Sequence, residues 1–461
     1  MNYVSTRGGM VPVPFQDAVM TGLARDGGLL LPEHIPSVGD RLAAWRDLSY
    51  SDLAFEIMRL FADDIPEADL RDLVNRSYAT FRHPDITPTR CVNGIHVLEL
   101  FHGPTLAFKD VALQFLGNCF EYVLQRRQTQ LNVLVATSGD TGSAAICGLR
   151  GRRGLRIFVM HPHGRVSPTQ ERQMTSVLDD NVFNMAIEGT FDDCQRIMKS
   201  LFADLAFKDR LELGTVNSIN WARVLAQIVY YFFSAFRVMR LTGAPCVQVA
   251  VPTGNFGDIF AGYVAHRMGL PISRLVLATN ENDILARFFT VGDYSQGPVH
   301  ATVSPSMDIQ VASNFERYLY YRVGEDPRRL SALMKDFAVN GRLDLAPEGS
   351  RMDEVIVAGS ANTAHTLETI REFHARHGYL LDPHTAVGVH VAREFLRSGE
   401  PMICLATAHP AKFGRAIADA TGQDLAHHPI LDALANLPTR CALLPARDTA
   451  VRDFMEQHIP R

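Results

Sequence analysis

The stretch Phe101-His-Gly-Pro-Thr-Leu-Ala-Phe-Lys-Asp110 joins a short apolar run to the start of a helical pattern. The run covers 96–101, the turn residues Gly103-Pro104 follow it, and the helical pattern begins at Val111. Lys109 therefore stands at a loop-to-helix junction with apolar neighbours on both sides. Two interpretations are open: a lysine that reaches solvent from a partly buried helix start, or an amine whose pKa is lowered by desolvation, so that it can form a Schiff base.

Short, continuous apolar runs follow this stretch, and segments with helical spacing separate several of them. Continuous apolar strands that alternate with helices are typical of parallel sheets covered on both faces. We therefore predict an α/β fold with strands at 131–136, 156–160, 182–187, 247–251, 275–278, 354–358 and 402–406. Beyond Thr421 the pattern predicts a helical stretch, a strand at 441–444 and a last helix from Asp448.

The first 92 residues combine glycine-rich turns with helical periodicity. Leucines and isoleucines recur on one face from Leu53 to Phe61, and Ser51 or Asp52 is the expected cap of that helix. We predict three parts: a mostly helical N-terminal layer (1–92), a large α/β domain (93–129 and 209–461) and a smaller, mobile α/β domain (130–208) that closes over a substrate.

Composition narrows the functional classes. The chain is 47% hydrophobic and 21% charged, as in soluble globular proteins. Its net charge of −5 argues against a nucleic-acid or anionic-membrane partner, because both usually require a basic face. The most apolar segment, Val224–Met239, is interrupted by Gln227 and Arg237, and we expect it to be too short to span a bilayer.

The seven cysteines are scattered without a Cys-x-x-Cys pair, which indicates neither a disulfide framework nor a zinc site, and we expect no bound metal. We expect most of them to be small core residues in a reducing cytoplasm. The N-terminal residues show no signal-peptide pattern, which also favours a cytoplasmic location.

The first of three strand ends that carry chemistry is Val135-Ala-Thr-Ser-Gly-Asp-Thr-Gly-Ser-Ala-Ala145. A Ser/Thr/Gly loop follows the strand, and a helix opens at about Ser143. Hydroxyls and free N–H groups at a helix N-terminus form an anion site that suits a carboxylate or a phosphate. The same residues would also serve in a simple capped turn.

The second is Val251-Pro-Thr-Gly-Asn-Phe-Gly-Asp-Ile259, where a strand passes through a glycine loop into a helix. Gly254 and Gly257 would let the backbone approach a phosphate, and the N–H groups of 255–258 would surround it. The loop is neither a P-loop nor a dinucleotide fingerprint.

The third is Cys404-Leu-Ala-Thr-Ala-His-Pro-Ala-Lys-Phe413. Thr407 would lie at the carboxyl end of its strand, where open α/β sheets bind ligands. His409 and Lys412 are nearby, although a lone histidine in such a place is more often structural than catalytic.

A phosphate loop, a second anion loop and a lysine in an apolar niche together indicate pyridoxal phosphate. In these motifs the chain resembles the threonine synthase family, whose members are pyridoxal-phosphate enzymes of the tryptophan-synthase β-like (type II) fold. The motifs span most of the chain in the family's order: Tyr3-Val-Ser-Thr-Arg-Gly8, Gly103-Pro-Thr-Leu-Ala-Phe-Lys-Asp110, Ala136-Thr-Ser-Gly-Asp-Thr-Gly142, His161-Pro-His-Gly-Arg-Val-Ser167, Val216-Asn-Ser-Ile-Asn-Trp-Ala-Arg223, Pro252-Thr-Gly-Asn-Phe-Gly257, Ser304-Pro-Ser-Met-Asp-Ile309 and Ala406-Thr-Ala-His-Pro410.

The resemblance implies two parallel-sheet α/β domains with a helical N-terminal layer, the larger domain binding pyridoxal 5′-phosphate. It implies that Lys109 carries the cofactor as a Schiff base and later moves protons. Thr407 would present a neutral hydroxyl to the pyridine nitrogen. The residues implied for the cofactor phosphate are Gly254, Asn255, Phe256, Gly257 and Asp258.

For the substrate, the resemblance implies a carboxylate site and a phosphate site. Ser138, Gly139, Asp140 and Thr141 would take the α-carboxylate, and Ser218, Asn220 and Arg223 would take the phosphate of O-phosphohomoserine. A second interpretation of 217–223 stays open, in which Ser218 caps a helix and Trp221 and Leu225 pack inward. Both can hold together.

The implied reaction is a β,γ-replacement, the last step of threonine biosynthesis, by a carbon–oxygen lyase that acts on phosphates. O-phospho-L-homoserine and water would give L-threonine and phosphate, in a monomer or homodimer without nucleic-acid or membrane partners. Two alternatives remain: a phospho-lyase or deaminase of the same family that releases a 2-oxo acid, and a non-catalytic relative that binds a phosphorylated effector. The intact Lys109 argues against the second.

Overall fold

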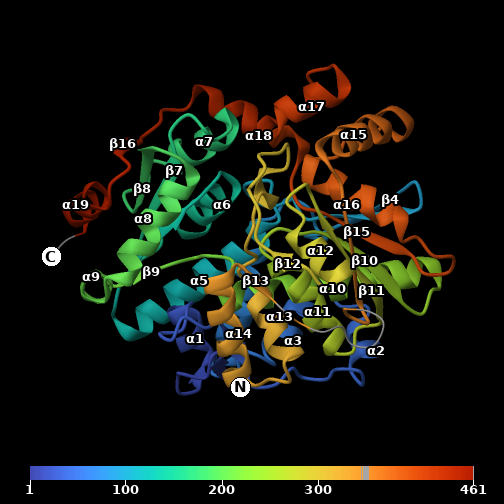
Figure 1. Ribbon diagram of the computed structural model, residues 1–461, viewed down its shortest axis with the longest axis horizontal. Coiled ribbons are helices and arrows are strands. Elements are labelled where there is room, and N and C mark those ends of the chain that lie inside the picture. Colours follow the sequence, from blue (N-terminus) through green and yellow to red (C-terminus); the bar gives the residue numbers. More distant parts are fainter. Residues whose placement is uncertain (344, 346–351, 460–461) are drawn as a thin grey trace.

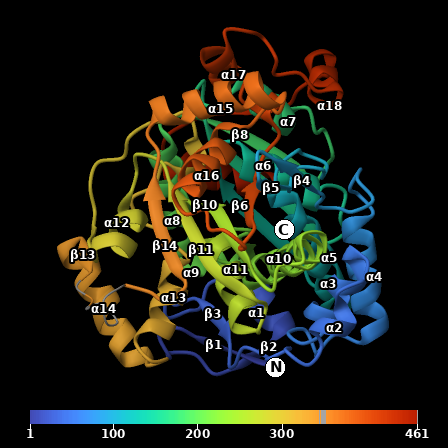
Figure 2. The same ribbon diagram turned by 90° about the vertical axis from the view of Figure 1, so that its right-hand side faces the viewer.

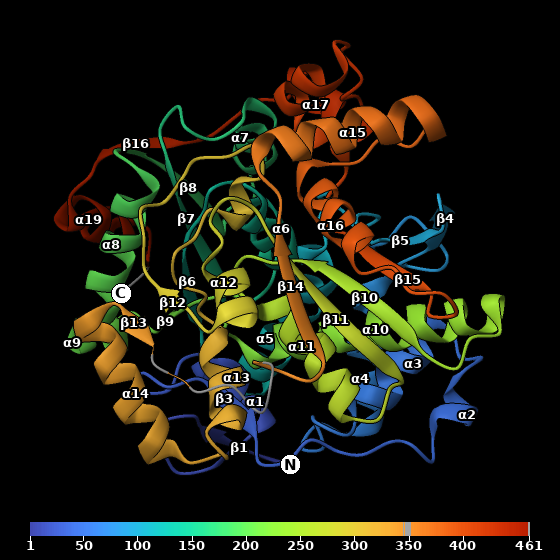
Figure 3. The ribbon, with the colours of Figure 1, turned by 45° about the vertical axis from the view of Figure 1, so that its right-hand side comes forward.

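A six-stranded sheet forms the centre of the larger lobe in the computed structural model, which describes residues 1–343, 345 and 352–459 (Figure 1). Neighbouring strands are parallel except for the edge pair β5 and β4, which is antiparallel. Figure 3 shows β14, β11, β10 and β15 side by side. The strand order is β14 (Ile356–Ser360), β11 (Ile272–Thr279), β10 (Val247–Pro252), β15 (Met402–Ala406), β5 (Ile95–Glu99) and β4 (Thr89–Val92).

Helices cover both faces of this sheet, because successive side chains of a strand point to opposite sides. Val249 and Val251 belong to the core that contains α10 (Trp221–Thr242) and α11 (Gly257–Arg267). Ala250 belongs to the opposite core with α16 (Pro383–Glu394), beside which lie α15 (Thr363–His377) and α17 (Gly414–Thr421). The prediction of a parallel sheet buried on both faces is confirmed.

A second, five-stranded sheet lies in the smaller lobe and is parallel throughout (Figure 1). Its order is β16 (Ala442–Pro445), β8 (Val182–Glu188), β7 (Leu155–Pro162), β6 (Leu131–Ala136) and β9 (Leu213–Gly214). Its helices include α6 (Asp140–Leu149), α7 (Pro168–Thr175), α8 (Phe191–Ala203) and α9 (Leu205–Arg210).

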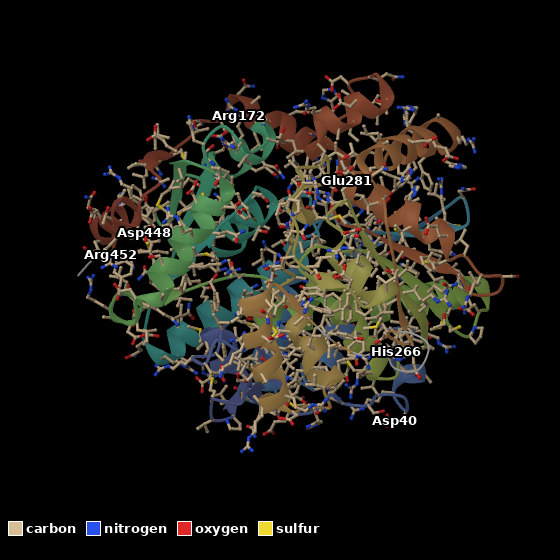
Figure 4. The ribbon with its side chains drawn as sticks, viewed as in Figure 1. Asp40, Arg172, His266, Glu281, Asp448 and Arg452 are labelled. Carbon is tan, nitrogen blue, oxygen red and sulfur yellow. The ribbon has the colours of Figure 1, made fainter. Side chains whose placement is uncertain are left out.

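The C-terminal segment crosses from the large lobe to the small one, which corrects the expectation that 209–461 lies wholly in the large domain. Strand β16 pairs with β8, and α19 (Asp448–His458) packs Val451 into the small-sheet core. Two arginine–aspartate pairs tie α19 to α8 and to the residue that caps α9: Arg196 with Asp448 at 2.9 Å, and Arg452 with Asp204 at 2.6 Å. Figure 4 labels the two partners on α19, Asp448 and Arg452.

The N-terminal layer is mixed rather than mostly helical, and it lies at the bottom of Figure 2. It contains an antiparallel sheet of β2 (Val13–Pro14), β1 (Asn2–Ser5) and β3 (Leu30–Pro32). Its helices are α1 (Phe15–Thr21), α2 (Leu42–Trp45), α3 (Tyr50–Met58) and α4 (Glu67–Tyr78). The cap of α3 is Ser49, whose hydroxyl accepts the N–H of Asp52 at 3.2 Å, and not Ser51 or Asp52.

Helix α10 is longer than the sequence indicated, with 22 residues. Among the described residues it is the one helix long and apolar enough to cross a membrane by length and composition, and 83% of its apolar stretch is buried within the protein. The expectation that this segment is too short to span a bilayer is therefore wrong, because the helix is long enough to do so. Its burial is that of a central core helix, which packs against α5 (Lys109–Arg127), α3 and α11.

The cysteines differ from the expectation. Cys119, Cys194 and Cys404 are buried, whereas Cys91 and Cys441 are exposed and the remaining two are half-buried, so core positions are a minority. All seven are free thiols. Thiols at the surface are compatible with a reducing surrounding.

Candidate active site

Lys109 begins α5 directly beside the end of strand β15. The N–H of Phe108 donates to the carbonyl of Thr407 at 2.8 Å, and the N–H of His409 donates to that of Leu106 at 3.0 Å. These bonds pair the lysine loop antiparallel to the residues that follow β15. Lys109 and Thr407 therefore share the carboxyl edge of the large sheet, where open α/β sheets bind ligands.

A rigid turn precedes Lys109. The N–H and hydroxyl of Thr105 donate to the two carboxylate oxygens of Asp110, each at 2.7 Å. Burial raises the pKa of Asp110 to about 6. Gly103 is required here, because a Cβ on it would lie 2.5 Å from the Cβ of Asp110. Leu106 has a φ of 62°, which is strained for a branched residue, and such strain is concentrated at functional sites.

The Lys109 amine is buried, with 8% of the residue exposed. Burial lowers its pKa to about 8; the carboxylate of Asp140 opposes this shift, and the charges of Arg223 and Lys412 add to it. An amine with a pKa near neutrality is able to attack a carbonyl and to exchange protons. Of the two interpretations of Lys109, the structure favours the desolvated amine.

This environment predicts a pH dependence. We expect kcat to rise with pH and to level off above about 8, because Lys109 must be uncharged to accept a proton. Asp140→Asn removes the charge that favours the ammonium form, so the rising limb should move to lower pH. Steady-state rates between about pH 6 and 10 measure both profiles. A limb that stays in place in the variant would contradict the coupling of Asp140 to Lys109.

The glycine loop after β10 has the geometry of an anion cradle. Within the described ranges, none of the backbone N–H groups of 254–259 has a hydrogen-bond partner. Phe256 takes a φ of 63°, and its ring anchors the loop in an aromatic cluster with Phe289 and Phe315. Free N–H groups that precede a helix N-terminus favour a phosphate. Gly254 is tightly enclosed, because a Cβ on it would lie 2.6 Å from the carbonyl oxygen of Ser306.

The side chains of this loop do not face a common centre. Asn255 is exposed. The carboxylate of Asp258 accepts hydrogen bonds from the hydroxyls of Tyr230 at 2.5 Å and Tyr231 at 2.9 Å, and burial raises its pKa to about 6. Because this pKa still lies below neutral pH, most of the Asp258 carboxyl is ionised there, and the two tyrosine hydroxyls donate to its charge. The groups of Asn255 and Asp258 that are free to meet an anion are therefore their backbone N–H groups.

Thr407 is held by a buried network that the sequence analysis missed. Its N–H donates to the hydroxyl of Thr385 at 3.3 Å, and that hydroxyl donates to the carboxylate of Asp382. His384 bonds the same carboxylate through Nδ1 at 2.9 Å and accepts the N–H of Ser306 at Nε2, at 3.3 Å. The sequence signal was the helix-start pattern Asp382-Pro-His-Thr385, with the cap and proline of α16.

The loop after β6 has the geometry of a second anion site. The hydroxyl of Thr137 accepts the N–H groups of Gly139 and Gly142, each at 2.9 Å. In the part of the chain that the structure describes, the N–H groups of Ser138, Asp140 and Thr141 have no partner. The Asp140 carboxylate is already engaged, by Lys412 at 2.8 Å and by Gln170 Nε2 at 2.8 Å.

The charge on Asp140 follows from these contacts. Burial alone would raise its pKa, but the neighbouring ammonium groups of Lys412 and Lys109 hold the pKa well below its usual range. A second carboxylate would be repelled by this side chain. The group that Asp140 could offer to a carboxylate is therefore its N–H at the start of α6, and not its side chain.

The 218–223 segment contains one buried charged side chain, that of Arg223. Arg223 is buried, its Nη1 donates to the carbonyl of Val216 at 2.9 Å, and among the described residues its Nε has no partner. Burial lowers the pKa of Arg223 to about 10, so it remains cationic at neutral pH. An unpaired N–H on a buried cation is a donor available to an anion.

The side chains of Asn220 and Ser218 make structural hydrogen bonds. Asn220 caps α10 by accepting the N–H of Ala222 at 3.1 Å, and it donates to the carbonyl of Val19 at 2.8 Å. The cap is therefore Asn220 and not Ser218, because only Asn220 immediately precedes the helix. Ser218 is half-buried, and its hydroxyl accepts the amide of Asn314 at 3.3 Å. Trp221 and Leu225 are fully buried, as the helix-start interpretation predicted.

These residues fit pyridoxal phosphate. The buried Lys109 amine, with its lowered pKa, suits the aldehyde of the cofactor. The free N–H groups of the glycine loop suit its phosphate, and the neutral Thr407 at the end of β15 suits its ring nitrogen.

Comparisons with known proteins agree with this fit. Three family models match: "Threonine synthase N terminus" at residues 2–78, "Pyridoxal-phosphate dependent enzyme" at 81–350 and "Threonine synthase, C-terminal" at 385–455. The threonine synthase of Pseudomonas aeruginosa is 48% identical over 99% of this chain and 98% of its own.

Solved structures give the same result. Threonine synthase from Brucella melitensis with bound pyridoxal phosphate superposes with a TM-score of 0.95 at 45% identity, covering 100% of both chains. Yeast threonine synthase has a TM-score of 0.94 at 42% identity, covering 99% of this chain and 98% of its own. The fold is thus the type II pyridoxal-phosphate fold, and the cofactor is pyridoxal 5′-phosphate. The chain belongs to the threonine synthase family.

Proposed function

We propose that this chain converts O-phospho-L-homoserine and water to L-threonine and phosphate, with Lys109 as the lysine that carries the cofactor and exchanges the protons. The observation that carries the proposal is the buried Lys109 amine, with a pKa of about 8, within electrostatic reach of the carboxylate loop and of Arg223. One anion loop and one cation suit a substrate with a carboxylate at one end and a phosphate at the other.

The chemistry divides between cofactor and protein. Pyridoxal phosphate, when bound, supplies an electron sink for carbanions formed next to the amino group. Lys109 removes the Cα proton and returns protons later, and burial keeps its amine partly uncharged for this task. Thr407 offers a hydroxyl rather than a carboxylate at the ring-nitrogen end, so it does not enforce a charge there.

Substrate binding follows from the two remaining groups. The N–H groups of Ser138, Asp140 and Thr141 bind the α-carboxylate, with the positive end of the α6 dipole behind them. Arg223 binds the phosphate through its free Nε–H and holds it as it departs from Cγ. Asn220 and Ser218 support Arg223 by fixing the start of α10 and the loop before it.

Replacing Arg223 with alanine should weaken substrate capture. We expect kcat/KM for O-phosphohomoserine to fall by about 10²-fold, mainly through KM, because a charge-assisted phosphate contact is lost. Arg223→Lys should recover part of the loss, since it keeps the charge without the planar fork.

The matched control is Arg237→Ala on the same helix. Arg237 pairs with Asp85 at 2.6 Å and should leave kcat/KM near the unmodified value. An unchanged kcat/KM in Arg223→Ala would reject the phosphate role.

We also place the enzyme in the cytoplasm. The free cysteines, two of them at the surface, are compatible with a reducing compartment, and the substrate is a small soluble molecule.

A further inference from the structure

A buried ion pair joins the two lobes beside Lys109. The ammonium of Lys412, in the segment that follows β15, lies 2.8 Å from the Asp140 carboxylate at the start of α6. The two side chains are 0% and 5% exposed. The partners come from loops at the ends of different sheets, so the pair spans the boundary between the lobes.

The lysine loop is tied to the same contact. The Thr105 carbonyl accepts from Lys412 Nζ at 2.9 Å and from Gln173 of α7 at 3.1 Å. Gln170, also on α7, donates to Asp140 and fits against Gly139, where a Cβ would lie 2.5 Å from the Gln170 amide carbon. Lys412 therefore holds the loop that carries Lys109 and the loop proposed to bind the substrate carboxylate in one register.

Other contacts also lie along this boundary. Leu106 and Ala411 pack against Leu431 of α18 (Pro429–Asp432). Arg172 of α7, at the top of Figure 4, donates to the carbonyl of Leu434 at 3.0 Å. Unlike these, the Lys412–Asp140 pair joins the two loops of the site directly. The charges of both its members act on the pKa of Lys109.

Breaking such a pair from one side is costly, because the remaining charge stays buried without a partner. In Lys412→Met the Asp140 carboxylate would have only Gln170 and the Lys109 amine as partners. Water would then enter to solvate it. The boundary between the lobes would open next to the reacting atoms.

We propose that the Lys412–Asp140 pair is the contact that keeps the carboxylate loop closed on the lysine loop during turnover, and that Lys412 is thereby a positioning residue that decides the product. The proposal rests on the proposed function. A closed site retains the substrate skeleton after phosphate leaves Cγ, until water adds at Cβ. An open site releases the skeleton before that addition.

The two outcomes use the same atoms. O-phosphohomoserine and one water give threonine and phosphate when water adds at Cβ. The same two reactants give the four-carbon 2-oxo acid, ammonia and phosphate when the unsaturated skeleton leaves early and its amino group is lost to hydrolysis. Both routes release one phosphate, so phosphate counts turnovers and the other products report the partition.

The test measures phosphate, threonine, 2-oxo acid and ammonia from O-phosphohomoserine with the cofactor-loaded enzyme. For Lys412→Met we expect the ratio of 2-oxo acid to threonine to rise by about tenfold or more, whatever happens to kcat. Asp140→Asn should raise the ratio in the same direction, and Lys412→Arg should stay near the unmodified ratio because it keeps the charge. The visible absorption of the bound cofactor shows that each variant is folded and loaded.

Arg452→Met is the matched control. It breaks an ion pair at the outer edge of the small lobe (Figure 4), so the product ratio should not change. An unmodified ratio in both Lys412→Met and Asp140→Asn would overturn the proposal, and if Lys412→Met does not fold, Asp140→Asn alone decides. If the unmodified enzyme releases no phosphate, the proposed function itself fails, which is a different result.

Discussion

Lys109→Ala should abolish turnover. We expect the rate of phosphate release to fall by at least about 10⁴-fold, because both the covalent attachment of the cofactor and the proton-transfer group are lost. The amine is buried. Lys412 contacts the same loop through the Thr105 carbonyl, but its ammonium is paired with Asp140 and is not free to replace Lys109. The visible absorption of the purified protein should change at the same time, since the cofactor can no longer bind to the lysine.

Lys199→Ala is the matched control, because Lys199 lies exposed on α8. It should leave both rate and spectrum unchanged. Appreciable threonine formation by Lys109→Ala would contradict the assignment of the base.

Gly254→Ala should prevent cofactor binding. Its Cβ would lie 2.6 Å from the carbonyl oxygen of Ser306, and neither backbone can retreat easily. Ser306 is fixed through its N–H by His384, which is held in turn by Asp382. The cradle must therefore distort, and we expect the affinity for pyridoxal phosphate to fall by about 10²-fold or more, because several N–H···phosphate bonds depend on its shape.

Gly257→Ala provides a graded comparison in the same loop. Its Cβ would meet the side-chain amide of Asn314 at 3.2 Å, a contact that a small shift relieves. We expect a loss of affinity smaller than that of Gly254→Ala, measured by titrating the cofactor-free protein with pyridoxal phosphate. Equal affinities for Gly254→Ala and the unmodified protein would show that the loop does not hold the phosphate.

The buried strands were predictable from the sequence because their apolar runs are continuous. The bounds of β6 and β15 agree with the predicted 131–136 and 402–406. Strand β14 begins at Ile356 rather than 354, because the Asp353 carboxylate accepts the N–H groups of Val355 and Ile356 and holds a turn there. Such local competition between side chain and backbone is weakly marked in a single sequence.

The placement of β16 beside β8 was not predictable, although the strand itself was. Pairing across about 250 residues depends on which sheet edge is free, and local sequence carries no record of that. For the same reason the sequence analysis assigned β16 and α19 to the large domain, whereas both pack with the small sheet.

In the candidate site, too, local motifs were predictable from the sequence and tertiary contacts were not. The three strand-end loops and Lys109 were found because glycine, hydroxyl and lysine residues are locally recognisable at strand ends. The Lys412–Asp140 pair was missed, because a buried ion pair is a tertiary contact between loops far apart in the chain. The free N–H groups and the commitment of Asn220 to capping α10 likewise became visible only with the folded backbone.

The most direct test is a single-tube assay of the purified enzyme, reconstituted with pyridoxal phosphate and given O-phospho-L-homoserine. Phosphate and threonine are measured together, and the absorption spectrum is recorded before and after substrate addition. We predict a visible cofactor band that changes with substrate, and threonine equal in amount to phosphate. Phosphate with the 2-oxo acid in place of threonine would contradict threonine formation, and no band and no phosphate would contradict the catalytic site built on Lys109.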